Sequence, residues 1–291
     1  MVEGLAGEAP EYAVTAPRTR RDRRVGIRLA GVWLTVVVAA AVTADLLPLG
    51  DPNKLAIGAK LARPLTAGHL LGTDGLGRDL LSRVVFGARV SLIVAAVSVI
   101  VGVLIGGALG VLAGYRGGLV DLVIMGALDV VLAFPALVLL LALVAVVGQS
   151  LITISFVVGL LSVPFYARVA RATTLQVRSA EYVTAARVLG VRPGRVLLGE
   201  VVPQVVLPLF TFATVAMAAV VVLEGSLAYL NLSVAPPTPT WGLIIAEGKR
   251  HLREAPHVVA VPASTLFLTV LSLNVLGQAG RARVSDRGAM S

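Results

Sequence analysis

Six long stretches of the chain are nearly uninterrupted runs of hydrophobic residues, separated by polar segments of unequal length. Each run is close to the ~20 residues that an α-helix needs to cross ~30 Å of hydrocarbon. Because lipid cannot satisfy unpaired backbone groups, and because alternating strand patterns are absent, we interpret the runs as transmembrane helices. The predicted spans are 29–47, 90–114, 119–147, 151–171, 205–230 and 258–278.

Composition supports this interpretation. The 291 residues are 57% hydrophobic and only 14% charged, whereas soluble domains carry roughly 45–50% apolar and about 25% charged residues. The net charge of +9 is expected of loops flanking membrane spans, so it indicates membrane lipid and not nucleic acid as a partner. We therefore predict an all-α polytopic membrane protein with six transmembrane helices.

The distribution of basic residues predicts the orientation. With both termini cytoplasmic, 16 of the 25 Lys and Arg residues fall on the cytoplasmic side, as the positive-inside bias requires. Residues 1–24 are polar and contain Pro, Gly and Arg residues, which predicts a disordered cytoplasmic tail. Residues 25–291 are then a single transmembrane domain, and the first run, longer than a signal-peptide core, is a retained helix.

The cytoplasmic segment 172–204 contains a predicted short amphipathic helix. From Ala180 to Leu189 the residues favour a helix, and four of them share one face: Tyr182, Ala185, Ala186 and Leu189. We expect Ser179 to cap its start and Glu181 to lie favourably in its first turn.

Gly190 marks the predicted end of this helix, since glycine readily adopts the left-handed conformation of a helix stop. Pro193 suits the first turn of a second short helix leading into the next span. The first helix, with its small exposed face, either docks in a groove of a partner or lies on the lipid headgroups.

The run from Glu181 to Gly190, followed by Pro203, resembles the EAA loop of binding-protein-dependent ABC importer permeases. The resemblance implies that this helix is the coupling helix, seated in a groove of a separate ATPase subunit. Its implied coupling residues are Glu181, Tyr182, Ala185, Ala186, Leu189 and Gly190.

A second signature narrows the resemblance. The stretch 69–83, leading into Gly87-Ala88-Arg89, resembles the C-type permeases of oligopeptide, dipeptide and nickel importers, as does Pro236-Pro237-Thr238-Pro239 before Trp241. The resemblance implies the type I importer permease fold in the cell inner membrane and a peptide cargo, with nickel or another small solute as the alternative.

The same resemblance implies the partners. They are a second, non-identical permease subunit, one or two ABC ATPase subunits that bind ATP and Mg²⁺, and an extracytoplasmic peptide-binding protein. This chain itself is expected to hold no cofactor.

Two acidic residues fall within predicted spans. An acid near the bilayer centre costs about 2.5–3.5 kcal/mol on insertion scales, so Glu224 and Asp129 should face the bundle interior or a water-filled path. Both are candidate residues of a translocation path. The alternatives are a hydrogen bond to a neighbouring helix for Glu224, and pairing with Arg168 or Arg171 for Asp129.

The outer loop carries Asp74, Arg78, Asp79 and Arg83, which alternate in sign. These residues either pair with one another within the loop or contact the binding protein or partner permease. His69 is interpreted as structural, since no second His or Cys lies at ligand spacing, and no metal site is predicted.

The energy source must lie elsewhere. No G-x-x-x-x-G-K-[ST] phosphate loop occurs, and the Lys residues are only Lys54, Lys60 and Lys249. We therefore predict a transport subunit without an ATPase site of its own. The alternative class is a secondary transporter or channel driven by an ion gradient, which would need its own ion site.

Overall fold

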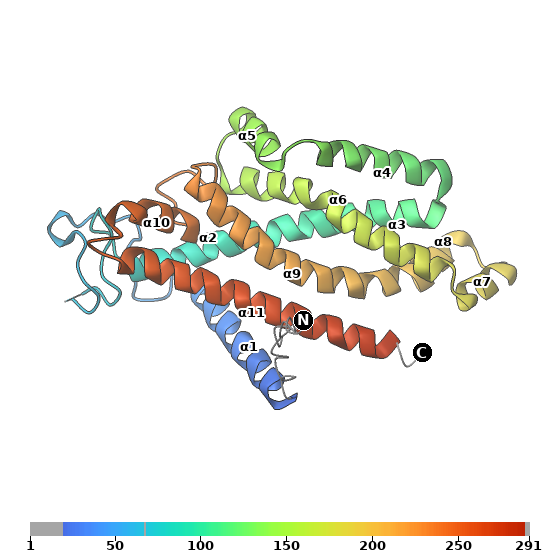
Figure 1. Cartoon of the computed structure of the whole chain (residues 1–291), viewed down its shortest axis with the longest axis horizontal. Helices are drawn as coiled ribbons and strands as arrows, with labels where there is room; N and C mark the ends of the chain where they lie inside the picture. Colours follow the sequence, from blue (N-terminus) through green and yellow to red (C-terminus); the bar gives the residue numbers. More distant parts are fainter. Residues whose placement is uncertain (1–19, 67, 289–291) are drawn as a thin grey trace, which may run out of the picture.

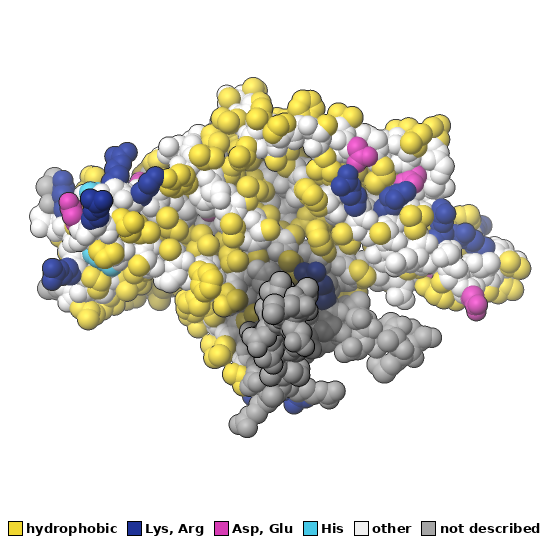
Figure 2. Space-filling view, viewed as in Figure 1, with side chains coloured by type: hydrophobic (Ala, Val, Ile, Leu, Met, Phe, Trp, Pro, Cys, Tyr) yellow, Lys and Arg dark blue, Asp and Glu magenta, His cyan; other side chains and the backbone are white. Residues whose placement is uncertain are grey.

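The computed structural model describes residues 20–66 and 68–288, and every regular element within them is a helix. Figure 1 shows an elongated bundle in which the longest helices run along the long axis of the molecule. Lys, Arg, Asp and Glu gather mainly toward its two ends, and the surface between them is mostly hydrophobic (Figure 2). This arrangement is expected of a protein whose middle lies in lipid.

Five helical stretches are long and apolar enough to span a membrane, which confirms most of the hydropathy prediction. A bent pair of helices supplies a sixth if it is counted as one span. The five are Arg24–Val42 in α1 (Arg20–Val42), Leu80–Arg116, Leu151–Arg178 (α6), Pro193–Tyr229 and His257–Arg281 in α11 (His257–Gly288).

The predicted continuous span 119–147 is wrong in shape. Helices α4 (Gly118–Ala133) and α5 (Ala136–Val147) meet at an angle of 86°. Pro135 causes the break, because proline disfavours the helical conformation in the residue before it, and Phe134 is extended at φ −82°, ψ 137°.

Span two begins ten residues earlier than the predicted position 90. The Asp79 carboxylate caps the helix by accepting a hydrogen bond from the Ser82 N–H at 2.8 Å. The helix consists of α2 (Leu80–Val101), a π-helical stretch (η2, Gly102–Gly106) and α3 (Gly107–Arg116).

Span five also extends beyond its prediction. The predicted second short helix, α8 (Pro193–Val196), continues through a π-helical stretch (η3, Leu197–Val201) into α9 (Val202–Tyr229). The widened turn lies just before Pro203, whose ring displaces the carbonyl of the preceding turn. The predicted loop 172–204 is therefore mostly helix, and only residues 179–192 link the two spans.

A stripe of glycines joins span two to α6. Gly102, Gly106, Gly110 and Gly114 recur every four residues on one helix face. A Cβ on any of them would overlap α6 atoms, including the backbone carbonyls of Val163, Ala167 and Arg171. Close backbone approach of this kind is how membrane helices associate, since no hydrophobic effect draws them together in lipid.

The end of the bundle that carries the proline-rich segment holds a further short helix. The prolines at 236, 237 and 239 precede it, and α10 (Trp241–Gly248) begins directly after them. Thr240 caps α10 by accepting from the Leu243 N–H at 3.1 Å. Trp241 is fully buried and donates its indole N–H to the Val84 carbonyl at 3.0 Å, which fixes α10 against α2.

Residues 1–19 of the predicted tail lie outside the described residues. The last five residues of the predicted tail, 20–24, belong to the first turns of α1. The remaining described elements are two short 3₁₀ turns, η1 (Ile57–Ala59) and η4 (Lys249–His251).

Candidate functional site

The predicted amphipathic helix forms at one end of the bundle. It is α7 (Glu181–Val188), and it lies at the opposite end of the molecule from α10 (Figure 1). Gly190 adopts φ +78° beyond its C-terminus, as predicted for a glycine stop. The helix therefore reverses the chain between two spans.

The side chains of α7 divide into an anchor and an open face. Val183 is fully buried, whereas Tyr182 is 47% exposed and Leu189 is 82% exposed. Ala185 is exposed and Ala186 is half-buried. Val183 anchors the helix to its own chain, and most of the predicted face is left uncovered by the rest of the described residues.

The predicted capping role of Ser179 is wrong. Ala180 occupies the N-cap position and makes no side-chain hydrogen bond there. Ser179 instead donates its hydroxyl to carbonyls of the last turn of α6, at 2.9 Å to Gln176 and 3.3 Å to Leu175. Span four continues to Arg178, so Ser179 ends α6 and does not begin α7.

A group of contacts that the sequence did not indicate ties this loop to the end of span two. The Tyr115 hydroxyl donates to the Pro193 carbonyl at 2.9 Å, and the Arg187 guanidinium lies 5.4 Å from the Tyr115 ring centroid. Arg178 donates to the carbonyls of Gly114 and Tyr115 at 3.0 and 3.3 Å. The loop is therefore attached to α6, to the Pro193–Tyr229 helix and to α3 together.

Asp129 forms an ion pair with Arg168, one of the two partners that the sequence predicts for it. Its carboxylate lies 2.6 Å from the Arg168 guanidinium, and both side chains are more than half exposed in the isolated subunit. Arg171 pairs with Asp121 instead, at 2.5 Å. Both ion pairs join α4 to α6. Whether Asp129 also contacts a translocation path stays a prediction.

Glu224 lies inside the subunit. Its side chain is 1% exposed and accepts hydrogen bonds from the hydroxyls of Ser91 at 3.1 Å and Ser233 at 2.8 Å. Ser91 in turn accepts from the Trp241 backbone N–H at 3.3 Å. The carboxylate thus links α9, α2 and the start of α10, which matches the hydrogen-bond alternative. Its role in a path stays a prediction.

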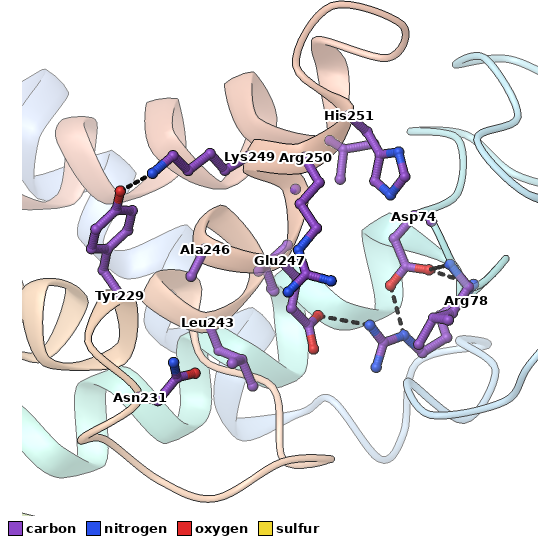
Figure 3. A pocket seen from close by; sticks show the side chains of 15 residues that line it. Asp74, Arg78, Tyr229, Asn231, Leu243, Ala246, Glu247, Lys249, Arg250 and His251 are labelled. Carbon is purple, nitrogen blue, oxygen red and sulfur yellow. Dashed lines mark hydrogen bonds and ion pairs between the residues drawn. The ribbon is translucent and has the colours of Figure 1, made fainter.

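The charged loop pairs partly with itself, as predicted, and partly with α10. Asp74 lies 2.6 Å from Arg78 and 3.3 Å from Arg83. Glu247 of α10, which the sequence did not single out, lies 2.7 Å from Arg78 (Figure 3) and 2.8 Å from Arg83. Separately, Asp79 accepts from His69 at 2.9 Å, which gives His69 a structural contact.

A cavity of about 770 Å³ opens beside this network. Loop residues 74–78 form one wall, and α10 with the turn after it forms another (Figure 3). Arg250, Lys249 and Tyr229 line it together with Glu247. Its size falls in the range of small-molecule binding pockets, roughly 300–1,000 Å³.

Comparison with known proteins matches this architecture to transport proteins. The profile described as binding-protein-dependent transport system inner membrane component matches residues 106–287. This region includes α7, the Pro193–Tyr229 helix and α10.

Curated relatives cover most of the chain. A glutathione transport system permease protein, GsiD, from Pectobacterium atrosepticum is 35% identical, covering 85% of this chain and 82% of its own. A di/tripeptide transport system permease protein, DppC, from Pseudomonas aeruginosa is 36% identical, with 84% and 83% covered. A dipeptide transport system permease protein, DppC, from Alkalihalophilus pseudofirmus is 31% identical, with 84% and 81% covered.

The family profile spans more than half of the chain, and these relatives align along most of both lengths. The apolar helices, the exposed α7 and the family match agree with one another. The chain is therefore a multi-pass inner-membrane protein that belongs to the family of inner membrane components of binding-protein-dependent transport systems.

Proposed function

We propose that this chain is one of two non-identical permease subunits of an ATP-driven importer of short peptides. All three relatives above are named for glutathione or for di- and tripeptides, which are all short peptides. Nickel or another small solute remains the alternative cargo.

The observation that carries the proposal is the uncovered face of α7 between two long helices. Leu189 and Val188 are each 82% exposed, although both are large apolar residues. Exposed apolar groups beside a helical turn, at the end of the bundle that we assign to the cytoplasm, suit a groove of a partner protein. We assign that groove to a separate ATPase subunit, which binds ATP and Mg²⁺.

The contacts of the loop suggest how movement passes to the bundle. α7 follows α6 directly, it precedes the Pro193–Tyr229 helix, and Tyr115 attaches the loop to span two. The glycine stripe packs span two tightly on α6, so these two helices move as one body. A groove that moves on ATP binding would therefore tilt three spans together and open a path to the other side.

The test is reconstitution of the importer in vesicles with its partner subunits. We expect uptake of a labelled dipeptide that requires ATP and persists with an uncoupler present. Uptake that needs an ion gradient instead would favour the secondary-transporter alternative, and uptake of nickel without dipeptide uptake would replace the cargo.

The coupling role has its own test. The chain contains no Cys, so a single Leu189→Cys substitution places one thiol on the α7 face. We expect it to crosslink to the ATPase subunit, with Gln149→Cys, exposed at the turn between α5 and α6, as the unreactive control. Equal crosslinking from both positions, or from neither, would contradict the proposal.

A further inference from the structure

The turn after α10 is unusually basic for its side of the membrane. Lys249, Arg250 and Arg253 are all exposed, with the half-buried His251 between them. They lie at the opposite end of the bundle from α7 (Figure 1), which our proposed function makes the extracytoplasmic end. Basic residues are normally depleted there, so topology does not account for this cluster.

The carboxylates at this end are largely used within the fold. Asp74 and Glu247 pair with Arg78 and Arg83, and other ion pairs engage Asp79 and Asp45. Among the described residues at this end, the ion pairs leave only two exposed acids, Asp51 and Glu254.

The cations of the turn, in contrast to these carboxylates, have no partner of opposite charge among the described residues. Within residues 20–66 and 68–288, Lys249, Arg250 and Arg253 form no ion pair. The outward-facing charge around the turn is therefore positive, which would attract an acidic partner.

The geometry around the turn is concave and well supported. Lys249 donates to the Tyr229 hydroxyl and lies 4.6 Å from that ring centroid, which fixes the ammonium at the edge of the cavity (Figure 3). Arg250 lines the same cavity. His251 packs against Gly75, where a Cβ would lie 2.5 Å from its Nε2, so the turn and loop 74–78 touch closely.

Apolar side chains lie among these cations. Leu76 lines the cavity and is 48% exposed, and Leu252 within the basic turn is 51% exposed. Exposed leucines beside charged groups are the mixture found at transient protein interfaces, where an apolar centre is surrounded by a polar rim.

We propose that the turn 249–253 and the cavity beside it form a docking surface for an acidic loop of the extracytoplasmic binding protein. This inference rests on the proposed function, which requires such a protein to deliver the peptide. A lipid surface fits less well, because it is flat and cannot enter a cavity that two of the cations line. A protruding protein loop can enter it and bring carboxylates close to Lys249 and Arg250.

The proposal predicts a specific kinetic change. In the reconstituted importer at saturating peptide, replacing Lys249, Arg250 and Arg253 by Gln should raise the binding-protein concentration for half-maximal ATPase stimulation by roughly tenfold. The maximal rate should stay unchanged, because the substitutions weaken docking and not the later steps. Added salt should weaken the wild type strongly and the variant little, since salt screens exposed charges.

Two further variants distinguish a local docking surface from general charge attraction. Arg250→Gln with Arg253→Gln leaves the Lys249–Tyr229 contact intact and should still give an increase of at least about threefold. The control is one variant that combines three substitutions, Lys54→Gln, Lys60→Gln and Arg63→Gln, and so removes the same charge from another exposed loop at this end. It should change the half-maximal concentration less than about twofold.

Three results would overturn the docking surface while leaving the proposed function intact. The first is an unchanged half-maximal concentration in the 249–253 variants. The second is an equal increase in the half-maximal concentration for the 54–63 variant, which would indicate general charge attraction. The third is a change only in the dependence on peptide concentration at saturating binding protein, which would indicate a cargo site. A wild-type importer without ATP-dependent uptake overturns the proposed function and the surface with it.

Discussion

Tyr115 at the end of α3 donates a hydrogen bond of 2.9 Å to the carbonyl of Pro193, the first residue of the long helix that becomes span five. The Arg187 guanidinium of α7 lies over the same ring. One side chain thus joins span two, the exposed helix and span five at the end of the bundle that we assign to the ATPase.

This relationship predicts a coupling defect. Tyr115→Phe keeps the ring beside Arg187 but loses the hydrogen bond, which contributes about 1 kcal/mol. We expect peptide uptake per ATP hydrolysed to fall roughly twofold to fivefold, and Tyr115→Ala to lower it further. The measurement is the ratio of labelled dipeptide uptake to phosphate release in vesicles.

Tyr166→Phe is the matched control. The Tyr166 hydroxyl is buried and has no hydrogen-bond partner among the described residues, so its removal should leave that ratio unchanged. If Tyr115→Phe behaves like Tyr166→Phe, the Tyr115 contact does not transmit movement.

A second prediction concerns Glu224. The carboxylate is 1% exposed and is held by Ser91 and Ser233. Glu224→Gln keeps one oxygen that accepts from one of these hydroxyls, and its amide N–H can donate to the other hydroxyl, so we expect dipeptide uptake and thermal stability close to wild type. Glu224→Leu leaves two buried hydroxyls without a hydrogen-bond acceptor and should lower stability by about 1–3 kcal/mol, measured as a lower Tm in detergent.

The alternative role in a translocation path gives the opposite pattern for the first variant. If the Glu224 charge attracts the peptide amine within the path, Glu224→Gln should reduce uptake while assembly with the partner subunits stays intact. A normal Tm combined with strongly reduced uptake would therefore reject the structural interpretation.

A third prediction concerns the ion network beneath the cavity. Arg83 is fully buried, and Glu247 accepts a hydrogen bond from its guanidinium at 2.8 Å. Glu247→Gln removes a negative charge that compensates the buried Arg83 guanidinium, and we expect the free energy of unfolding to fall by about 1–3 kcal/mol. The loss is smaller than for a fully buried pair because Glu247 itself is one-third exposed. The readout is again Tm in detergent, and Glu254→Gln, an exposed acid without an ion pair among the described residues, should leave it unchanged.

The sequence predicted the spans and the α7 segment because both rest on local patterns. Apolar runs of membrane length identify helices, and the left-handed Gly190 stop follows from glycine chemistry alone. The prediction failed where one residue outweighed the average of its neighbours: Pro135 divides an otherwise continuous apolar run, and Asp79 starts a helix well before hydropathy rises.

The candidate polar contacts were predicted less well, because their partners are distant in the sequence. Arg78 and Glu247 are 169 residues apart, and Tyr115 and Pro193 are 78 apart. Only packing brings such pairs together. The pairing of Asp129 with Arg168 was predictable because the two residues lie at similar depth on adjacent predicted spans.

The last prediction concerns the glycine stripe between span two and α6. A methyl group at Gly110 would overlap the Ala167 carbonyl and approach the Ala170 Cβ, both on a rigid helix that cannot move aside. Gly110→Ala should therefore push the helices apart and destabilise the subunit by about 1–3 kcal/mol, as overpacking does in other cores. Gly126→Ala in α4 is the control, because a Cβ at Gly126 would have no neighbouring atom within 4 Å and because alanine favours helices. Tm and yield of the assembled importer should fall for the first variant and hold for the second. Equal values for both would show that close approach along this seam is not required.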